Sequence, residues 1–199
     1  MAVPLLLALH PTRWDGHVCL WLFSLYALFI LTRTRGFSWR DLWQGKTWPW
    51  RQKKQALLRF AVATAFIIMF TSCTVPYRLF SFPLQRPWFW LLVMVLYPIL
   101  SALPQELVFR SFFFRRYGDL FPEKTAMVAA NAFLFGLIHV MFHNWVSPLL
   151  SAVAGGLFAW SYTQHRSLKW ATIEHAAYGC MVFTAGIGFY FLVGAFRPS

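Results

Sequence analysis

The sequence has 199 residues, of which 59% are hydrophobic and 20% aromatic, while only 12% are charged; soluble domains average about 25% charged residues. Eighteen Lys and Arg residues against six acidic residues give a formal net charge of +12, and the basic residues are bunched between apolar runs. This pattern excludes an ordinary soluble domain and disfavours a nucleic-acid-binding protein, and it predicts an all-α, polytopic integral membrane protein whose partners are membrane lipids and no nucleic acid.

The apolar runs predict about six transmembrane helices in a single domain that covers residues 1–199, each near the ~20 residues that a bilayer requires. The apolar segment 1–10 lacks a basic start and a small-residue cleavage pattern, so we expect it to stay in the mature protein. Pro104 follows the third span directly, and because the apolar pattern resumes at once, we expect a kink there rather than a helix end. The predicted spans are 18–32, 60–75, 88–103, 124–143, 146–163 and 170–196.

A basic stretch follows the first span and is interleaved with tryptophans. This composition is typical of a cytoplasmic loop that lies on anionic headgroups with its tryptophans in the interfacial belt. With this loop inside, thirteen of the eighteen basic residues fall on inner connections, which predicts that both termini lie outside. The stretch contains Arg33, Arg35, Arg40, Lys46, Arg51, Lys53, Lys54 and Arg59, with Trp39, Trp43, Trp48 and Trp50.

Glu106 and Arg110 place a carboxylate and a guanidinium in an otherwise apolar segment. Because they are four residues apart, they lie on one face of a helix, where each can satisfy the other. Ionisable groups at membrane depth are costly unless they are paired or functional. Two interpretations stay open at this point, namely a structural ion pair that joins two helices and a part of a reactive site. Glu174 is the only other acidic residue within a long apolar segment.

Three histidines lie in the later spans: His139 deep in the fourth, His143 one turn further, and His175 near the start of the last. At ~1.5 Å of helix rise per residue, Glu106 lies ~16 Å and His139 ~22 Å from the inner boundary, whereas His175 lies only ~9 Å from it. His175 is therefore expected to meet the other two only if its helix tilts or the cavity slopes towards the cytoplasm.

A carboxylate beside two imidazoles is compatible with two chemistries. The carboxylate can act as a general base while the imidazoles position water and stabilise an oxyanion, or the histidines can bind zinc and the carboxylate can work on a metal-bound water. His139 and His143 have zinc-like spacing, but Val140 replaces the glutamate of an HExxH motif. We expect no cofactor and no metal ligands, with zinc left open; a lone histidine can also be only an interhelical hydrogen-bond partner.

Taken together, these residues resemble the CAAX protease and bacteriocin-processing family (CPBP or Abi family) of intramembrane endopeptidases. That family has EExxxR on one helix, FxxxH on the next and HxxxN or HxxxD on a later one. The corresponding segments here are Gln105-Glu106-x-x-x-Arg110, Phe135-x-x-x-His139 and His175-x-x-x-Gly179, in the right order within residues 97–190. The resemblance implies a helical bundle with a water-accessible cavity, and hydrolysis of a peptide bond near the membrane-anchored C-terminal tail of a protein or peptide substrate.

Two positions depart from the family pattern. Gln105 replaces the first glutamate, usually considered the catalytic base, and an amide cannot take a proton at neutral pH. Gly179 replaces the usual asparagine, whose amide can assist an oxyanion hole; Asn131 or Asn144 is a candidate substitute. Glu106 therefore serves as the base of a variant site, or the protein is inactive, or Gln105 is an inactivating change. The sequence leaves these three possibilities open.

The leading prediction is a glutamic-type endopeptidase in which Glu106 is the base, Arg110 fixes its carboxylate, and His139 and His175 support water and oxyanion. Segments 104–106 and 174–179 are similar to a bacterial subgroup associated with C-terminal sorting signals, which implies a multi-pass protein of the bacterial inner membrane. The alternatives are an inactive scaffold, immunity or peptide-binding protein, and last a small transporter, because no internal repeat is visible. Candidate supporting or substrate-binding residues are His143, Asn131, Asn144 and Tyr178.

Overall fold

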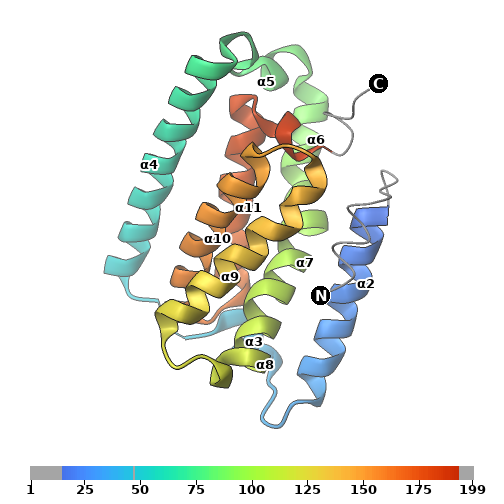
Figure 1. Ribbon diagram of the computed structural model, residues 1–199, viewed down its shortest axis with the longest axis vertical. Coiled ribbons are helices and arrows are strands. Elements are labelled where there is room, and N and C mark those ends of the chain that lie inside the picture. The colour runs from blue at the N-terminus through green and yellow to red at the C-terminus, as the bar shows by residue number, and fades with distance from the viewer. Residues whose placement is uncertain (1–14, 47, 193–199) are drawn as a thin grey trace.

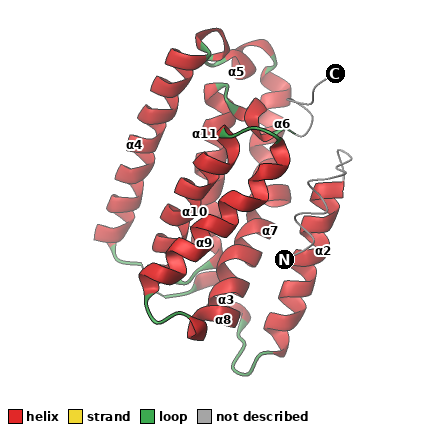
Figure 2. Cartoon of the chain, in the orientation of Figure 1, coloured by secondary structure: helices red, strands yellow, loops and turns green. Residues whose placement is uncertain are grey.

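The computed structural model describes residues 15–46 and 48–192, and every regular element within them is a helix (Figure 2). The expected all-α bundle is confirmed, with long helical units near all six predicted spans. The elements are α2 (Asp15–Arg33), α3 (Trp39–Gln44), α4 (Trp50–Thr74), η1 (Pro76–Arg78), α5 (Ser81–Gln85), α6 (Pro87–Tyr97), η2 (Pro98–Ala102), α7 (Leu103–Glu106), η3 (Leu107–Phe112), α8 (Phe113–Tyr117), η4 (Gly118–Leu120), α9 (Lys124–Ile138), η5 (His139–Phe142), α10 (Val146–His165), α11 (Leu168–Ala185) and η6 (Gly188–Phe191).

Four helical stretches of the described chain are long and apolar enough to cross a membrane. Helices α4 and α2 lie on opposite sides of the bundle, with α9, α10 and α11 between them (Figure 1). Helices α10 and α11 carry several buried polar side chains, because they face other helices rather than lipid. The chain is thus an integral membrane protein with a polar interior. The four stretches are 16–33, 50–74, 87–120 and 124–142.

The third span continues through its prolines, as predicted for Pro104. Because proline has no N–H to donate, the ordinary ladder is interrupted at Pro98 and Pro104. The backbone responds with widened π-helical turns in η2 and η3, and the N–H of Leu103 bonds the Pro98 carbonyl. Such widened turns are frequent at functional sites. The second one begins directly after Glu106.

Two predicted boundaries were wrong. The second span begins at Trp50 rather than residue 60, so Arg59 lies within α4 and not in a loop. The last helix ends at Ala185 rather than residue 196, and residues 193–196 lie outside the described part of the chain. Gly186 has φ +98°, and a Cβ there would overlap the carbonyl of Arg78. This left-handed, crowded position is available only to glycine, and it ends the helix.

The tryptophans of the basic stretch divide into two groups. Trp39, Trp43 and Trp50 are exposed, as an interfacial belt requires. Trp48 is not part of that surface: it is 8% exposed, and its ring lies 4.8 Å from that of His165. The prediction that all four tryptophans lie at the interface was therefore wrong for Trp48, which packs the stretch against the ends of α10 and α11.

Candidate active site

Glu106, the last residue of α7, is turned into the protein and is fully buried. Its Oε1 lies 2.8 Å from Nδ1 of His175 on α11, and its Oε2 lies 3.2 Å from Nε of Arg110 in an ion pair with unfavourable hydrogen-bond angles. A carboxylate can only accept, so Nδ1 of His175 carries the hydrogen. In the tautomer with its hydrogen on Nδ1, the Nε2 atom of His175 is an acceptor.

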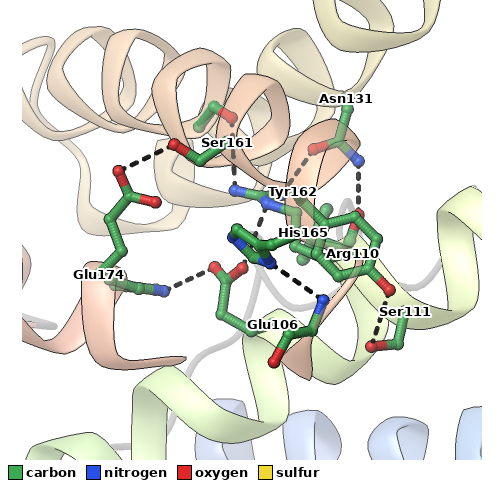
Figure 3. Close-up of polar contacts among 12 residues, drawn as sticks. Glu106, Arg110, Ser111, Asn131, Ser161, Tyr162, His165 and Glu174 are labelled. Carbon is green, nitrogen blue, oxygen red and sulfur yellow. Dashed lines mark hydrogen bonds and ion pairs between the residues drawn. The ribbon is translucent and has the colours of Figure 1, made fainter. Parts of the chain in front are cut away.

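Arg110 is held from several sides within the bundle. Its Nη1 donates to Oδ1 of Asn131 at 2.5 Å and its Nη2 to the Gly155 carbonyl at 3.4 Å, while its guanidinium lies 5.0 Å from the ring centroid of Phe135. Figure 3 shows the polar contacts of Arg110, with Asn131 and Glu106 nearby. Asn131 in turn donates to a backbone carbonyl at 2.6 Å. This network fixes the position of the carboxylate.

A large, mostly apolar cavity of about 1890 Å³ is lined by His139 and His175 but not by His143. Phe135 lies between them, with its ring centroid 4.9 Å from that of His139 and 5.6 Å from that of His175. Nδ1 of His139 lies 2.6 Å from the Phe135 carbonyl, which can only accept, so Nδ1 is the donor. His139 and His175 therefore line one cavity, and in these tautomers each keeps Nε2 as an acceptor.

Gln105 and Glu106 face different surroundings, because consecutive residues of a helix point in different directions. Gln105 lines the cavity, whereas Glu106 is not among its lining residues. Nε2 of Gln105 donates to Oγ of Ser101 at 2.8 Å, and its Oε1 is buried without a hydrogen-bond partner in the described chain. At the cavity wall there is thus an amide, and the carboxylate lies behind it.

Tyr97 is a site residue that the sequence reasoning missed. It lines the cavity, and its hydroxyl lies 3.0 Å from Nε2 of His175. A Cβ added at Gly179 would overlap this phenol ring and its hydroxyl. A signal was present in the sequence, because Tyr97 and Ser101 are the only hydroxyl-bearing residues of the run 87–103.

A second polar cluster, also missed, joins α4, α10 and α11. Oγ of Ser161 donates to Oε1 of Glu174 at 3.1 Å and accepts from Nη2 of Arg59 at 2.6 Å, and Arg59 Nη2 lies 3.6 Å from Glu174 Oε1. Figure 3 shows the Ser161–Glu174 contact beside the Arg110 network. The second intramembrane carboxylate is therefore paired on its own, because Arg59 belongs to α4 and not to the loop to which the sequence pattern assigned it.

Of the remaining predicted residues, one lines the cavity, two make buried or partly buried hydrogen bonds, and one lies on the surface. Tyr178 lines the cavity. Asn131 supports Arg110, and Asn144 donates to the Tyr190 carbonyl at 2.8 Å and accepts from a backbone N–H at 2.9 Å. His143 is exposed, with φ +56°, so it does not share a helix face with His139. The described residues contain no group of three or more His, Cys, Asp and Glu side chains that could hold a metal ion.

The sequence predicted that His175 lies closer to the inner membrane boundary than Glu106, but this difference does not keep the two side chains apart. The start of α11 is covered by the segment around α3, where Oγ of Ser167 donates to the Trp43 carbonyl at 2.6 Å. Glu106 and His175 nevertheless meet, since Oε1 of Glu106 lies 2.8 Å from Nδ1 of His175.

The comparisons with known proteins bear on the same segment. Searches of curated proteins and of solved structures give no significant match. Residues 87–181 match a family model described as Rce1-like, type II CAAX prenyl endopeptidase. The matched segment contains Gln105, Glu106, Arg110, His139 and His175, and it confirms the resemblance of the three motifs to this family. The match thus supports a CAAX-type intramembrane protease with a lipid environment and a protein or peptide substrate.

Proposed function

We propose that the protein is an intramembrane endopeptidase of the bacterial inner membrane that hydrolyses a peptide bond near the membrane-anchored C-terminal tail of a protein substrate. The observation that carries this proposal is the 2.8 Å bond between Glu106 Oε1 and His175 Nδ1, because His175 also lines the cavity. A buried carboxylate is thereby connected to a space that can hold water and substrate. The apolar lining suits a segment that leaves the lipid phase.

In this proposal Glu106 acts through His175 rather than directly on water. The sequence alone suggested Glu106 as the base, but its carboxylate lies behind the cavity wall. A water in the cavity donates one hydrogen to Nε2 of His175 and the other to Nε2 of His139, so its oxygen lone pair is free to attack. His175 takes the first proton, and the Glu106 carboxylate stabilises the imidazolium that forms. Arg110 keeps that carboxylate in place.

Gln105 has a binding role in the same proposal. Its Oε1 is an unpartnered acceptor at the cavity wall, and peptide groups of a substrate offer N–H donors. Accepting one such donor orients the scissile bond and satisfies a buried polar atom, which otherwise carries a desolvation cost of about 1–3 kcal/mol.

The test uses purified protein in liposomes and a reporter protein that carries a C-terminal transmembrane tail, with a prenylated CAAX peptide as the second substrate arm. Mass spectrometry identifies the cleavage products. His175→Ala and His139→Ala are expected to lose at least about 100-fold in rate, as removal of acid–base groups does. His143→Ala is the matched control, because this histidine is exposed. Undiminished cleavage in the His175 and His139 variants would remove the assignment, and cleavage of the prenylated peptide alone would replace the substrate class.

The cavity amide also favours a second candidate function, that of an inactive family member that binds a hydrophobic tail. Gln105 stands where the family's first glutamate would face the cavity. This candidate predicts binding of the tail to liposomes that contain the wild-type protein, without turnover. Turnover that appears only in Gln105→Glu would establish it.

A further inference from the structure

We propose that Tyr97 is a catalytic residue whose hydroxyl donates the oxyanion hydrogen bond that Gly179 cannot supply. The proposal rests on the proposed hydrolysis and names one more group in the same site. It starts from the departure at position 179, where the family that the chain resembles has asparagine or aspartate and this chain has glycine, with no side chain at all.

The phenol of Tyr97 occupies the space that a side chain at position 179 would enter. A Cβ built on Gly179 overlaps Cε1, Cζ and the hydroxyl oxygen of Tyr97. Such an overlap with a packed ring cannot be relieved by a small shift. The glycine and the tyrosine are therefore one structural unit: the missing side chain makes room for the phenol, and the phenol brings a hydrogen-bond donor to the vacated place.

The ring is held by neighbours on α11. Its centroid lies 5.5 Å from that of Phe183 at an interplanar angle of 69°, and 6.0 Å from that of His175 at 73°. Edge-on packing of this kind favours one ring orientation. A donor that is already oriented is what stabilisation of a developing charge requires.

The hydrogen bond of Tyr97 in the resting site indicates how the donor is released. Nδ1 of His175 donates to Glu106, so the hydroxyl, at 3.0 Å, donates to Nε2. Nε2 has a single lone pair. When a water presents its hydrogen to Nε2, it displaces the hydroxyl, which is then free to donate to the substrate oxygen beside it.

The proton and electron balance is that of simple hydrolysis. A water O–H bond breaks and its proton moves to Nε2 of His175, while the water oxygen bonds to the carbonyl carbon. The carbonyl π pair becomes the oxyanion, which accepts the Tyr97 hydrogen bond. Nε2 then gives its proton to the amide nitrogen as the C–N bond breaks and the oxyanion collapses to the new carboxyl group.

The first experiment measures kcat and KM for the tail reporter with Tyr97→Phe, which keeps the ring and removes only the hydroxyl. Loss of one oxyanion donor is expected to lower kcat by about 10²–10³-fold with KM unchanged. The matched control is Tyr162→Phe, a buried tyrosine whose hydroxyl donates to Ser111 Oγ at 3.4 Å outside this cavity. An unchanged kcat in Tyr97→Phe, or a change in KM alone, would overturn the proposal.

A rescue experiment separates the donor role from packing. Gly179→Asn alone is expected to fold poorly, because its side chain meets the phenol. In Tyr97→Ala/Gly179→Asn the ring is gone and an amide is present, so this double variant is expected to exceed Tyr97→Ala in kcat by about tenfold, part of what an oxyanion donor contributes. Equal rates in the two variants count against the donor role. If His175→Ala keeps wild-type activity, both the proposed function and the role of Tyr97 are refuted. If His175→Ala loses activity and Tyr97→Phe keeps it, only the role of Tyr97 is refuted.

Discussion

Removing one partner of the Glu106–Arg110 pair is expected to destabilise the bundle far more than removing both. Arg110→Met keeps side-chain length but leaves the Glu106 carboxylate buried, with His175 as its one remaining partner among the residues that the structure describes. Breaking a fully buried pair in this way costs about 3–5 kcal/mol. Asn131 and the Gly155 carbonyl also lose a donor, which places the expected cost at the upper end of that range.

The double variant Glu106→Gln/Arg110→Met removes both charges and keeps an amide oxygen that can accept from His175. It is expected to cost clearly less than Arg110→Met alone, because no unpaired charge remains in the interior. The free energy of unfolding in detergent micelles, measured by SDS titration for the wild type, both single variants and the double variant, completes the cycle. If the cost of the double variant equals the sum of the two single costs, the residues are not coupled and the reasoning is refuted.

Two further predictions concern the supports of the site. Asn131→Leu is expected to lower the midpoint of SDS-induced unfolding, because a buried N–H of Arg110 and a backbone carbonyl each lose their hydrogen-bond partner. Each lost partner costs about 1–3 kcal/mol in the free energy of unfolding. An unchanged midpoint would contradict the network around Arg110. Gly186→Ala is expected to cost at least about 1–3 kcal/mol, because its φ is +98° and the new Cβ meets the Arg78 carbonyl. The matched control is Gly156→Ala, whose Cβ makes an ordinary 3.5 Å contact. If Gly186→Ala and Gly156→Ala lose the same stability in thermal unfolding, the explanation is refuted.

Local sequence spacing was enough to predict the Glu106–Arg110 pair, because residues four apart on a helix always lie close together. It was not enough to tell which of Gln105 and Glu106 faces the cavity. Tyr97 and Ser101 lie eight and four residues before Gln105, but the run is otherwise apolar, and these two hydroxyls alone do not establish which face is wet. The packing of α7 against α11 decides this, and it places the amide at the wall and the carboxylate behind it.

Long-range contacts set the other limit of prediction. The Tyr97–His175 hydrogen bond joins residues 78 positions apart, and nothing in the spacing of the motifs requires it. The Arg59–Glu174 pair was hidden for a different reason: Arg59 stands at the end of a basic run, and composition alone assigns such a residue to the loop. Only the helix start at Trp50 moves it into the bundle.

The exchange of a glutamate for Gln105 changes what the rest of the site must do. A carboxylate at position 105 would face the cavity and could act on water directly, whereas a carboxylate at position 106 cannot reach it without a bridge. His175 is that bridge, since one of its nitrogens bonds Glu106 and the other faces Tyr97 and the cavity. In the mechanism that we propose, the bridging imidazole is committed to proton transfer and cannot also donate to the oxyanion. That mechanism therefore needs a separate donor, and the Tyr97 hydroxyl, which fills the space beside Gly179, is the donor that we propose.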